Sequence, residues 1–139
     1  MFKPHFTGGQ IFGLIGLGGI FWISGVIIIR NMSHILFQNR RWQIVSYFAG
    51  FPLFYIMLGI TEAILGLDAR HRLIATTLMS AVASMMDGTA LMYFPTLYEN
   101  PDISKRNPQA SLQLSRMGAA WLLWVFGVGF AVALLTNAY

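Results

Sequence analysis

The residue with the clearest chemical potential is Asp87, an acid inside the almost wholly apolar stretch from Thr76 to Pro95. A carboxyl group at membrane depth is costly, and such groups commonly relay protons, contact substrates or pair with a cation. Small or polar residues recur around it at steps of three and four, so a helix would place them on one face. We expect this polar seam to face other helices rather than lipid; besides Asp87 its members are Thr76, Ser80, Ser84 and Gly88.

A second acid, Glu62, shares a helical face with other small residues in the preceding apolar run. At the helical rise, Glu62 lies about 9 Å from the end of the bundle that holds the Asp68 turn, and Asp87 lies about 20 Å from the same end along the next run. The two acids should therefore occupy different depths and not share a proton, which requires contact. We expect separate charge partners, namely Arg30 or Arg116 for Asp87 and Arg70 or Arg72 for Glu62.

Two roles remain open for these acids. A neutral or arginine-paired acid can pin helices together, whereas a titrating acid can handle a proton or a substrate along a polar path. The sequence pattern is compatible with both.

Other chemistry lacks the residues it needs. The three histidines, His5, His34 and His71, lie outside or at the edges of the apolar runs, where they cannot supply facing ligands for haem or a metal. Ser80 and Ser84 have no histidine on any apolar run to act as a base, and the chain contains no cysteine. The sequence therefore predicts no enzyme of its own, no metal and no cofactor.

The composition indicates an integral membrane protein. Of the 139 residues 56% are hydrophobic and only 10% are charged, far from the balance of a soluble domain. The net charge of +4 does not indicate nucleic-acid binding, because the basic residues lie between apolar runs instead of forming a basic surface with interleaved aromatics.

Four apolar runs are long enough to cross a bilayer at about 20 residues each. We therefore predict one all-α domain, an antiparallel bundle of four transmembrane helices with both termini on one side. The connection 30–44 should contain an interfacial turn, and 96–116 should be a surface loop where a partner binds. The predicted spans are 10–29, 45–67, 73–95 and 117–137.

Small residues and tryptophans have expected structural roles in this bundle. Glycine and alanine at spacings of three or four let membrane helices approach closely, and Gly18 with Gly25, or Gly129 with Ala133, offer further pairs. Tryptophan is enriched at the membrane boundary. The expected interface anchors are Trp42, Trp121 and Trp124, and the expected packing residues are Gly9, Gly13, Gly16, Gly59, Ala63, Gly127 and Ala131.

The basic residues predict an orientation. Cytoplasmic connections carry an excess of Lys and Arg, which favours external termini and cytoplasmic connections at 30–44 and 96–116. The three basic residues on the terminal side are Lys3, Arg70 and Arg72; the six on the other side are Arg30, Arg40, Arg41, Lys105, Arg106 and Arg116.

The run MMDGTALMYFPTLYENP, followed by GAAWLLWVFGVGFAVALL, resembles a family of small four-helix bacterial integral membrane proteins of unknown function. In that family an acid in the third helix precedes a Phe-Pro pair, a short loop and a tryptophan-bearing last helix. Asp87, Phe94, Pro95, Trp121 and Trp124 occupy the matching positions. The resemblance covers the C-terminal half by motif and the first two helices by hydropathy, and it implies a bacterial inner-membrane protein without implying an activity.

Three functions are compatible with these patterns. The first is helix–helix association in the bilayer, as an oligomer with itself or as an accessory subunit of a larger membrane complex. The second is a small oligomeric transporter or proton-coupled channel that uses Asp87 and Glu62. The third is binding of a lipid or a quinone between the helices, with Trp121, Trp124 and Arg116 at the mouth.

Overall fold

The computed structural model describes residues 5–137, and this part of the chain is helical without any strand. Four of its helices are long and apolar enough to cross a membrane, which confirms the all-α class with four candidate transmembrane helices. The long helices are α1 (Gly8–Leu36), α2 (Arg40–Leu65), α3 (Arg72–Tyr93) and α5 (Pro108–Thr136); the short ones are η1 (Ala69–His71), η2 (Pro95–Tyr98) and α4 (Pro101–Arg106).

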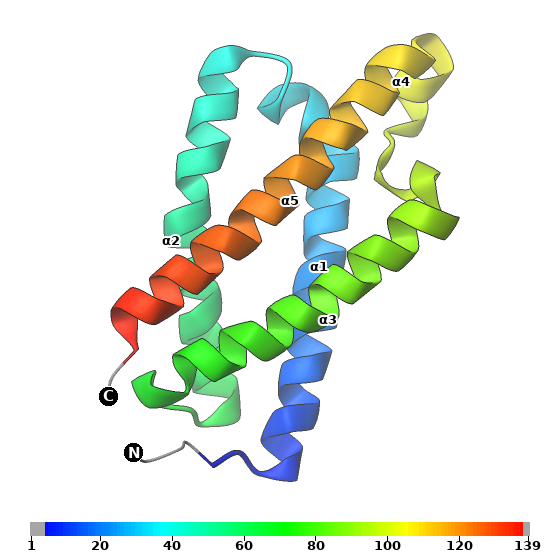
Figure 1. The fold of residues 1–139 in the computed structure, drawn as a ribbon. Coiled ribbons are helices and arrows are strands. Elements are labelled where there is room, and N and C mark those ends of the chain that lie inside the picture. Colours follow the sequence, from blue (N-terminus) through cyan, green and yellow to red (C-terminus); the bar gives the residue numbers. More distant parts are fainter. Residues whose placement is uncertain (1–4, 138–139) are drawn as a thin grey trace.

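The long helices alternate in direction, and α3 and α5 cross obliquely over the pair α1 and α2 (Figure 1). The start of α1 and the end of α5 lie at one end of the bundle, here called the terminal end, and α4 lies at the other, here called the α4 end. At 29 residues each, α1 and α5 reach about 44 Å. Because a bilayer core measures about 30 Å, helices of this length fit by tilting.

The helices α1, α2 and α5 begin before the predicted spans because polar residues cap their starts. Thr7 accepts from the Gln10 backbone amide in a capping box at the start of α1. Asn39 caps α2, which ends at Gly66 in the left-handed region with φ of 61°, a conformation that glycine adopts without steric cost.

The segment 96–116 is not the surface loop that the sequence led us to expect. Asn100 caps α4 and Asn107 caps α5, each followed by a proline at the first helical position. An asparagine cap followed by proline is a strong helix-start signal. The last helix therefore begins at Pro108 instead of residue 117.

Close helix contacts occur at fewer small residues than predicted. A β-carbon at Gly18 would lie 2.9 Å from the Met79 carbonyl oxygen, and one at Gly25 would lie 2.9 Å from Leu122. Gly129 similarly faces the Phe54 ring, and Gly13 faces Leu65. These positions join α1 to α2, α3 and α5, and join α5 to α2.

The other predicted packing residues are exposed: Gly9, Gly16, Gly59, Ala63, Gly127 and Ala131. A step of four residues turns a helix about 40° past one full turn, so an i, i+4 series drifts away from the face of its first member. The predicted packing glycines whose β-carbon positions come within 3 Å of a neighbouring helix are Gly13, Gly18, Gly25 and Gly129.

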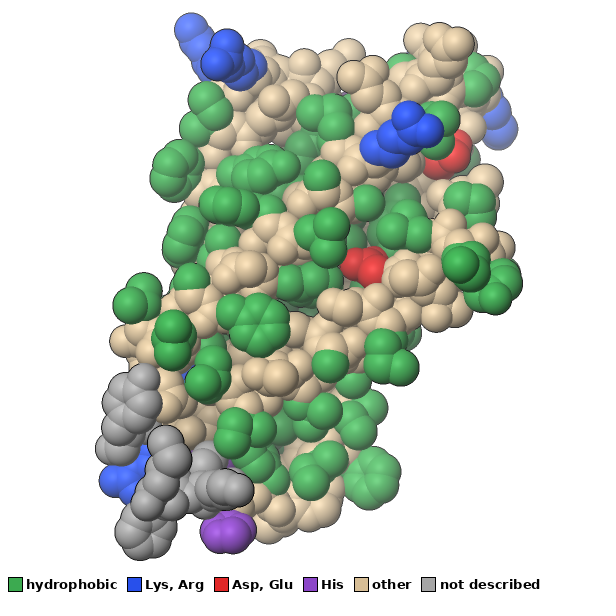
Figure 2. Space-filling model, viewed as in Figure 1, with side chains coloured by type: hydrophobic (Ala, Val, Ile, Leu, Met, Phe, Trp, Pro, Cys, Tyr) green, Lys and Arg blue, Asp and Glu red, His purple; other side chains and the backbone are tan. Residues whose placement is uncertain are grey.

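The outer surface has the character of a lipid-facing one. Apolar side chains cover the face formed by α3 and α5, while Lys and Arg gather toward the two ends (Figure 2). Large exposed apolar residues include Phe12, Phe48, Ile64, Leu123 and Leu135. Exposing this much apolar surface to water would be unfavourable, whereas contact with the hydrocarbon of a bilayer avoids that cost.

Candidate functional site

Asp87 is held by hydrogen bonds from two aromatic side chains. The Trp22 Nε1–H donates to Asp87 Oδ1 over 2.7 Å, and the Tyr98 hydroxyl donates a short hydrogen bond to the same oxygen. Trp22 comes from α1 and Tyr98 from η2, so the acid of α3 joins three elements. Asp87 lies about 9 Å from the C-terminal end of α3 at the helical rise.

The segment after α3 positions Tyr98. Pro95 opens η2, and the Arg30 Nη1 of α1 donates to the Leu97 carbonyl oxygen over 3.2 Å. The Asn100 side chain returns a 3.0 Å hydrogen bond to the Arg30 carbonyl oxygen. These contacts hold η2 against α1, and Tyr98 is only 1% exposed.

Tyr98 is a permanent hydrogen-bond donor at physiological pH. Its burial raises the pKa of the phenol above its usual value, and the hydrogen bond to Asp87 raises it further. Because the protonated phenol is the form stabilised by the fold, this contribution to stability is present below about pH 10 and is lost as the pH rises beyond it.

Sequence reasoning did not find Trp22 and Tyr98 as partners of Asp87. Both are aromatic residues with a polar tip, and such tips usually find a partner when buried. Their residue types therefore indicated that each would need a hydrogen-bond partner. Their positions, 65 and 11 residues from Asp87, did not indicate that Asp87 is that partner.

One oxygen of Asp87 remains without a donor. Both hydrogen bonds end on Oδ1, and Oδ2 accepts none from the described residues. Asp87 keeps 9% of its surface exposed. An ionised or neutral carboxyl oxygen without a partner in hydrocarbon is costly.

The polar seam predicted on α3 divides between two faces. Thr76 and Ser80 are buried with Asp87, whereas Ser84 and Gly88 are exposed on the surface of the bundle. The i, i+4 steps from Thr76 to Gly88 drift by about 120° around the helix, which turns the last two residues outward. Within the single chain, neighbouring helices therefore cover Thr76, Ser80 and Asp87 and leave Ser84 and Gly88 uncovered.

Glu62 forms a second polar cluster at the terminal end of the bundle. Arg72, at the start of α3, donates to both carboxylate oxygens; its Nη2 lies 3.1 Å from Glu62 Oε2 and its Nε makes a shorter contact with Oε1. The Arg72 Nη1 also donates to the Thr136 carbonyl oxygen over 3.0 Å, and the guanidinium lies 5.9 Å from the centre of the Tyr55 ring. Arg72 thus ties together the ends of α2, α3 and α5.

The charge partners proposed from sequence have different outcomes. Arg72 pairs with Glu62, while Arg70 is exposed. Neither Arg30, which binds the Leu97 backbone, nor exposed Arg116 forms an ion pair with Asp87. Neutral aromatic donors occupy the side of the acid where an arginine was expected.

Of the predicted membrane anchors, one lies in the core. Trp121 is 5% exposed and its Nε1–H donates to the Ser46 carbonyl oxygen over 3.1 Å. Because α5 begins at Pro108, Trp121 is well inside the helix instead of near its start. Trp42 and Trp124 are exposed, but Trp124 also lies in the middle of α5, where its Nε1–H donates to the Tyr47 carbonyl oxygen over 3.1 Å.

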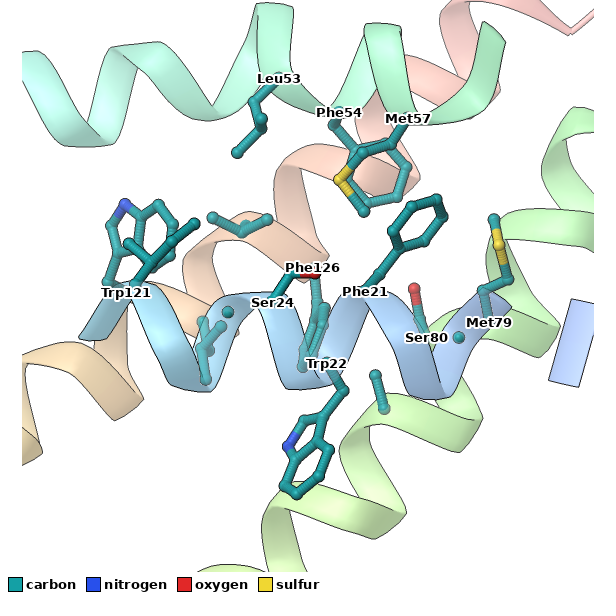
Figure 3. A pocket seen from close by; sticks show the side chains of 16 residues that line it. Phe21, Trp22, Ser24, Leu53, Phe54, Met57, Met79, Ser80, Trp121 and Phe126 are labelled. Atoms are coloured by element: carbon teal, nitrogen blue, oxygen red, sulfur yellow. The ribbon is translucent and has the colours of Figure 1, made fainter. Parts of the chain in front are cut away.

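A cavity of about 170 Å³ lies at the centre of the bundle and touches all four long helices (Figure 3). Phe54 and Met57 of α2 point toward Phe21 of α1 across it. Its lining is almost entirely apolar. Other residues that line the cavity include Trp22, Ser24, Ser80, Ala83, Trp121 and Phe126.

No metal site emerges among residues 5–137, where no group of three or more His, Cys, Asp or Glu side chains gathers. His71 instead contacts Asp68 over 2.7 Å, and this hydrogen bond lowers the pKa of Asp68. His5 is exposed, and His34 Nδ1 is buried without a partner in the described part of the chain.

Comparisons with known proteins give no relative for this chain, since neither a family model, nor a curated protein, nor a solved structure matches it.

Proposed function

We propose that the protein works in the membrane through helix–helix association, as an accessory subunit of a larger membrane complex. The observation that carries this proposal is the Asp87 Oδ2 atom at the apolar surface, a hydrogen-bond acceptor to which no described residue donates. A neighbouring transmembrane helix can supply that donor.

The exposed side of α3 near Asp87 suits a second helix. Four exposed small residues, here called the outer face of α3, follow one another at steps of four, three and four: Thr77, Ala81, Ser84 and Gly88. Small residues at this spacing let membrane helices approach closely enough for interhelical hydrogen bonds. Ser84 and Gly88 lie within one turn of Asp87.

The partner helix should carry a basic or amide side chain at the depth of Asp87. A symmetric pair of copies about a two-fold axis would bring two carboxyl groups together at equal depth, and like charges in contact disfavour each other. Association with a different subunit therefore fits the charge of this surface better than self-association.

The contacts of the two acids do not favour the transporter reading. Glu62 is paired with Arg72, Asp87 is hydrogen-bonded to Trp22 and Tyr98, and the two clusters lie toward opposite ends of α3. The cavity between them is lined by apolar side chains. A proton path needs polar groups or water along this distance.

We further propose a bacterial inner membrane as the location, on the family resemblance, with both termini outside. The α4 end carries six of the nine Lys and Arg residues, which favours placing it in the cytoplasm.

Asp87→Asn is expected to dissociate the complex while preserving the fold. Asparagine keeps the Oδ1 acceptor for Trp22 and Tyr98, but replaces the free acceptor with a donor. Loss of a charge-assisted hydrogen bond weakens an interaction by at least tenfold. The measurement is the stoichiometry of a foreign subunit that co-purifies with the protein in mild detergent.

Asp102→Asn is the matched control, because it removes the same charge from an exposed position in α4 and should keep the partner bound. Equal recovery of the partner with Asp87→Asn and wild type would refute the role of Oδ2. Isolation of the wild-type protein as a homogeneous self-assembly would refute the accessory role.

A further inference from the structure

We infer that the central cavity binds the ring of a membrane-soluble quinone, held by a hydrogen bond from Ser80. This inference rests on the cavity and does not depend on the proposed association. It concerns binding alone and includes no redox step.

The cavity has one free polar group. The Ser80 side chain lines it and is 5% exposed, and its hydroxyl forms no hydrogen bond with the described residues. The other polar groups of the lining are already used, since the Ser24 hydroxyl donates to the Ile20 carbonyl oxygen over 2.9 Å. The indole N–H groups of Trp22 and Trp121 donate to Asp87 and Ser46.

Water does not suit this cavity. A buried water typically needs two to four polar partners, whereas the lining offers only the Ser80 hydroxyl. A mostly apolar molecule that brings an acceptor to Ser80 matches the lining better, because it fills the volume and gives that hydroxyl a partner.

Size and shape favour a ring. An engineered apolar cavity of about 150 Å³ in another protein takes benzene, and this one measures about 170 Å³. Aromatic side chains from three helices surround it, namely Phe21, Phe54, Trp121 and Phe126. Aromatic faces and edges pack well against a planar ring.

Depth distinguishes a quinone from a phospholipid. Ser80 lies about 12 Å along α3 from its N-terminal end at the helical rise, inside the hydrocarbon core. The ester carbonyl groups of a phospholipid stay at the interface, and its acyl chains carry no acceptor. A quinone ring brings a carbonyl oxygen to this depth.

The tail of such a molecule has an exit. Ser24 of α1 and Leu53 of α2 line the cavity and are exposed to the outside, so the cavity reaches the surface between these helices. An isoprenoid or alkyl tail attached to the ring can leave there into lipid.

The test uses the purified protein in phosphatidylcholine nanodiscs, titrated with a benzoquinone that carries a ten-carbon tail. The readout is quenching of tryptophan fluorescence, because Trp121 lines the cavity. We expect a saturable component in wild type, an affinity about fivefold weaker in Ser80→Ala, and no saturable component in Ala83→Leu, which fills the cavity.

Ser84→Ala is the matched control, because it removes a hydroxyl from the outer face of α3 and should bind the probe like wild type. Ser80→Ala should fold at least as well as wild type, since it removes an unpartnered buried hydroxyl; the test therefore holds even if Ala83→Leu does not fold. Quenching without saturation in wild type, or equal affinity in wild type and Ser80→Ala, would overturn the inference. Decane that competes as well as the quinone probe would assign the cavity to an acyl chain instead.

Discussion

Replacing Arg72 with alanine is expected to lower the free energy of unfolding by about 3 kcal/mol. The substitution leaves Glu62 without its bidentate partner, removes the bond to the Thr136 carbonyl oxygen and opens the contact with Tyr55. A poorly solvated charge that loses its partner costs much more than the intact pair contributes. Equilibrium unfolding in mixed detergent micelles measures the change.

Arg70→Ala provides the control, because Arg70 is exposed two residues away and its loss should change stability by less than about 0.5 kcal/mol. A double variant, Glu62→Met with Arg72→Met, should recover much of the loss, since it removes both charges together. Equal effects of Arg70→Ala and Arg72→Ala would show that the cluster does not hold the three helix ends.

Replacing Gly18 with leucine is expected to cost about 3 kcal/mol or to prevent folding. A β-carbon at Gly18 would lie 2.9 Å from the Met79 carbonyl oxygen and 3.1 Å from its Cα. These are backbone atoms, so α3 as a whole must move to admit a side chain. The displacement would also disturb the Trp22–Asp87 contact one turn further along α1.

Gly16→Leu tests whether the loss of stability depends on the packing of Gly18 or follows from replacing any glycine of α1. A β-carbon at Gly16 meets nothing within 4 Å, so the leucine would point into lipid and stability should stay within about 0.5 kcal/mol of wild type. Similar losses for both variants would contradict the α1–α3 packing described above.

The sequence was sufficient for the fold class because hydropathy alone reports long apolar helices. It was less informative about helix ends. Asn100-Pro101 and Asn107-Pro108 were interpreted as loop residues, although the pair of an asparagine cap and a first-turn proline starts a helix. The structure shows both starts.

The sequence allowed one of the two polar clusters to be predicted, and not the other. Glu62 and Arg72 lie on either side of a short turn, so proximity along the chain brought them together as candidates. The donors to Asp87 depend on how α1 and η2 pack against α3, which a single sequence does not encode locally. The drift of the i, i+4 series explains why Ser84 and Gly88 lie on a different face of α3 from Thr76 and Asp87.

Site-directed cross-linking on the outer face of α3 tests the proposed association most directly. The chain has no cysteine, so Ala81→Cys can carry a benzophenone label without background, and Ile64→Cys on α2, 63% exposed, gives the lipid-facing control. Illumination of native membranes should join Ala81→Cys to one foreign subunit, and adding Asp87→Asn should abolish that adduct. Lipid adducts alone at both positions would contradict association at this face, and a product of two 15.5 kDa chains would contradict the accessory role.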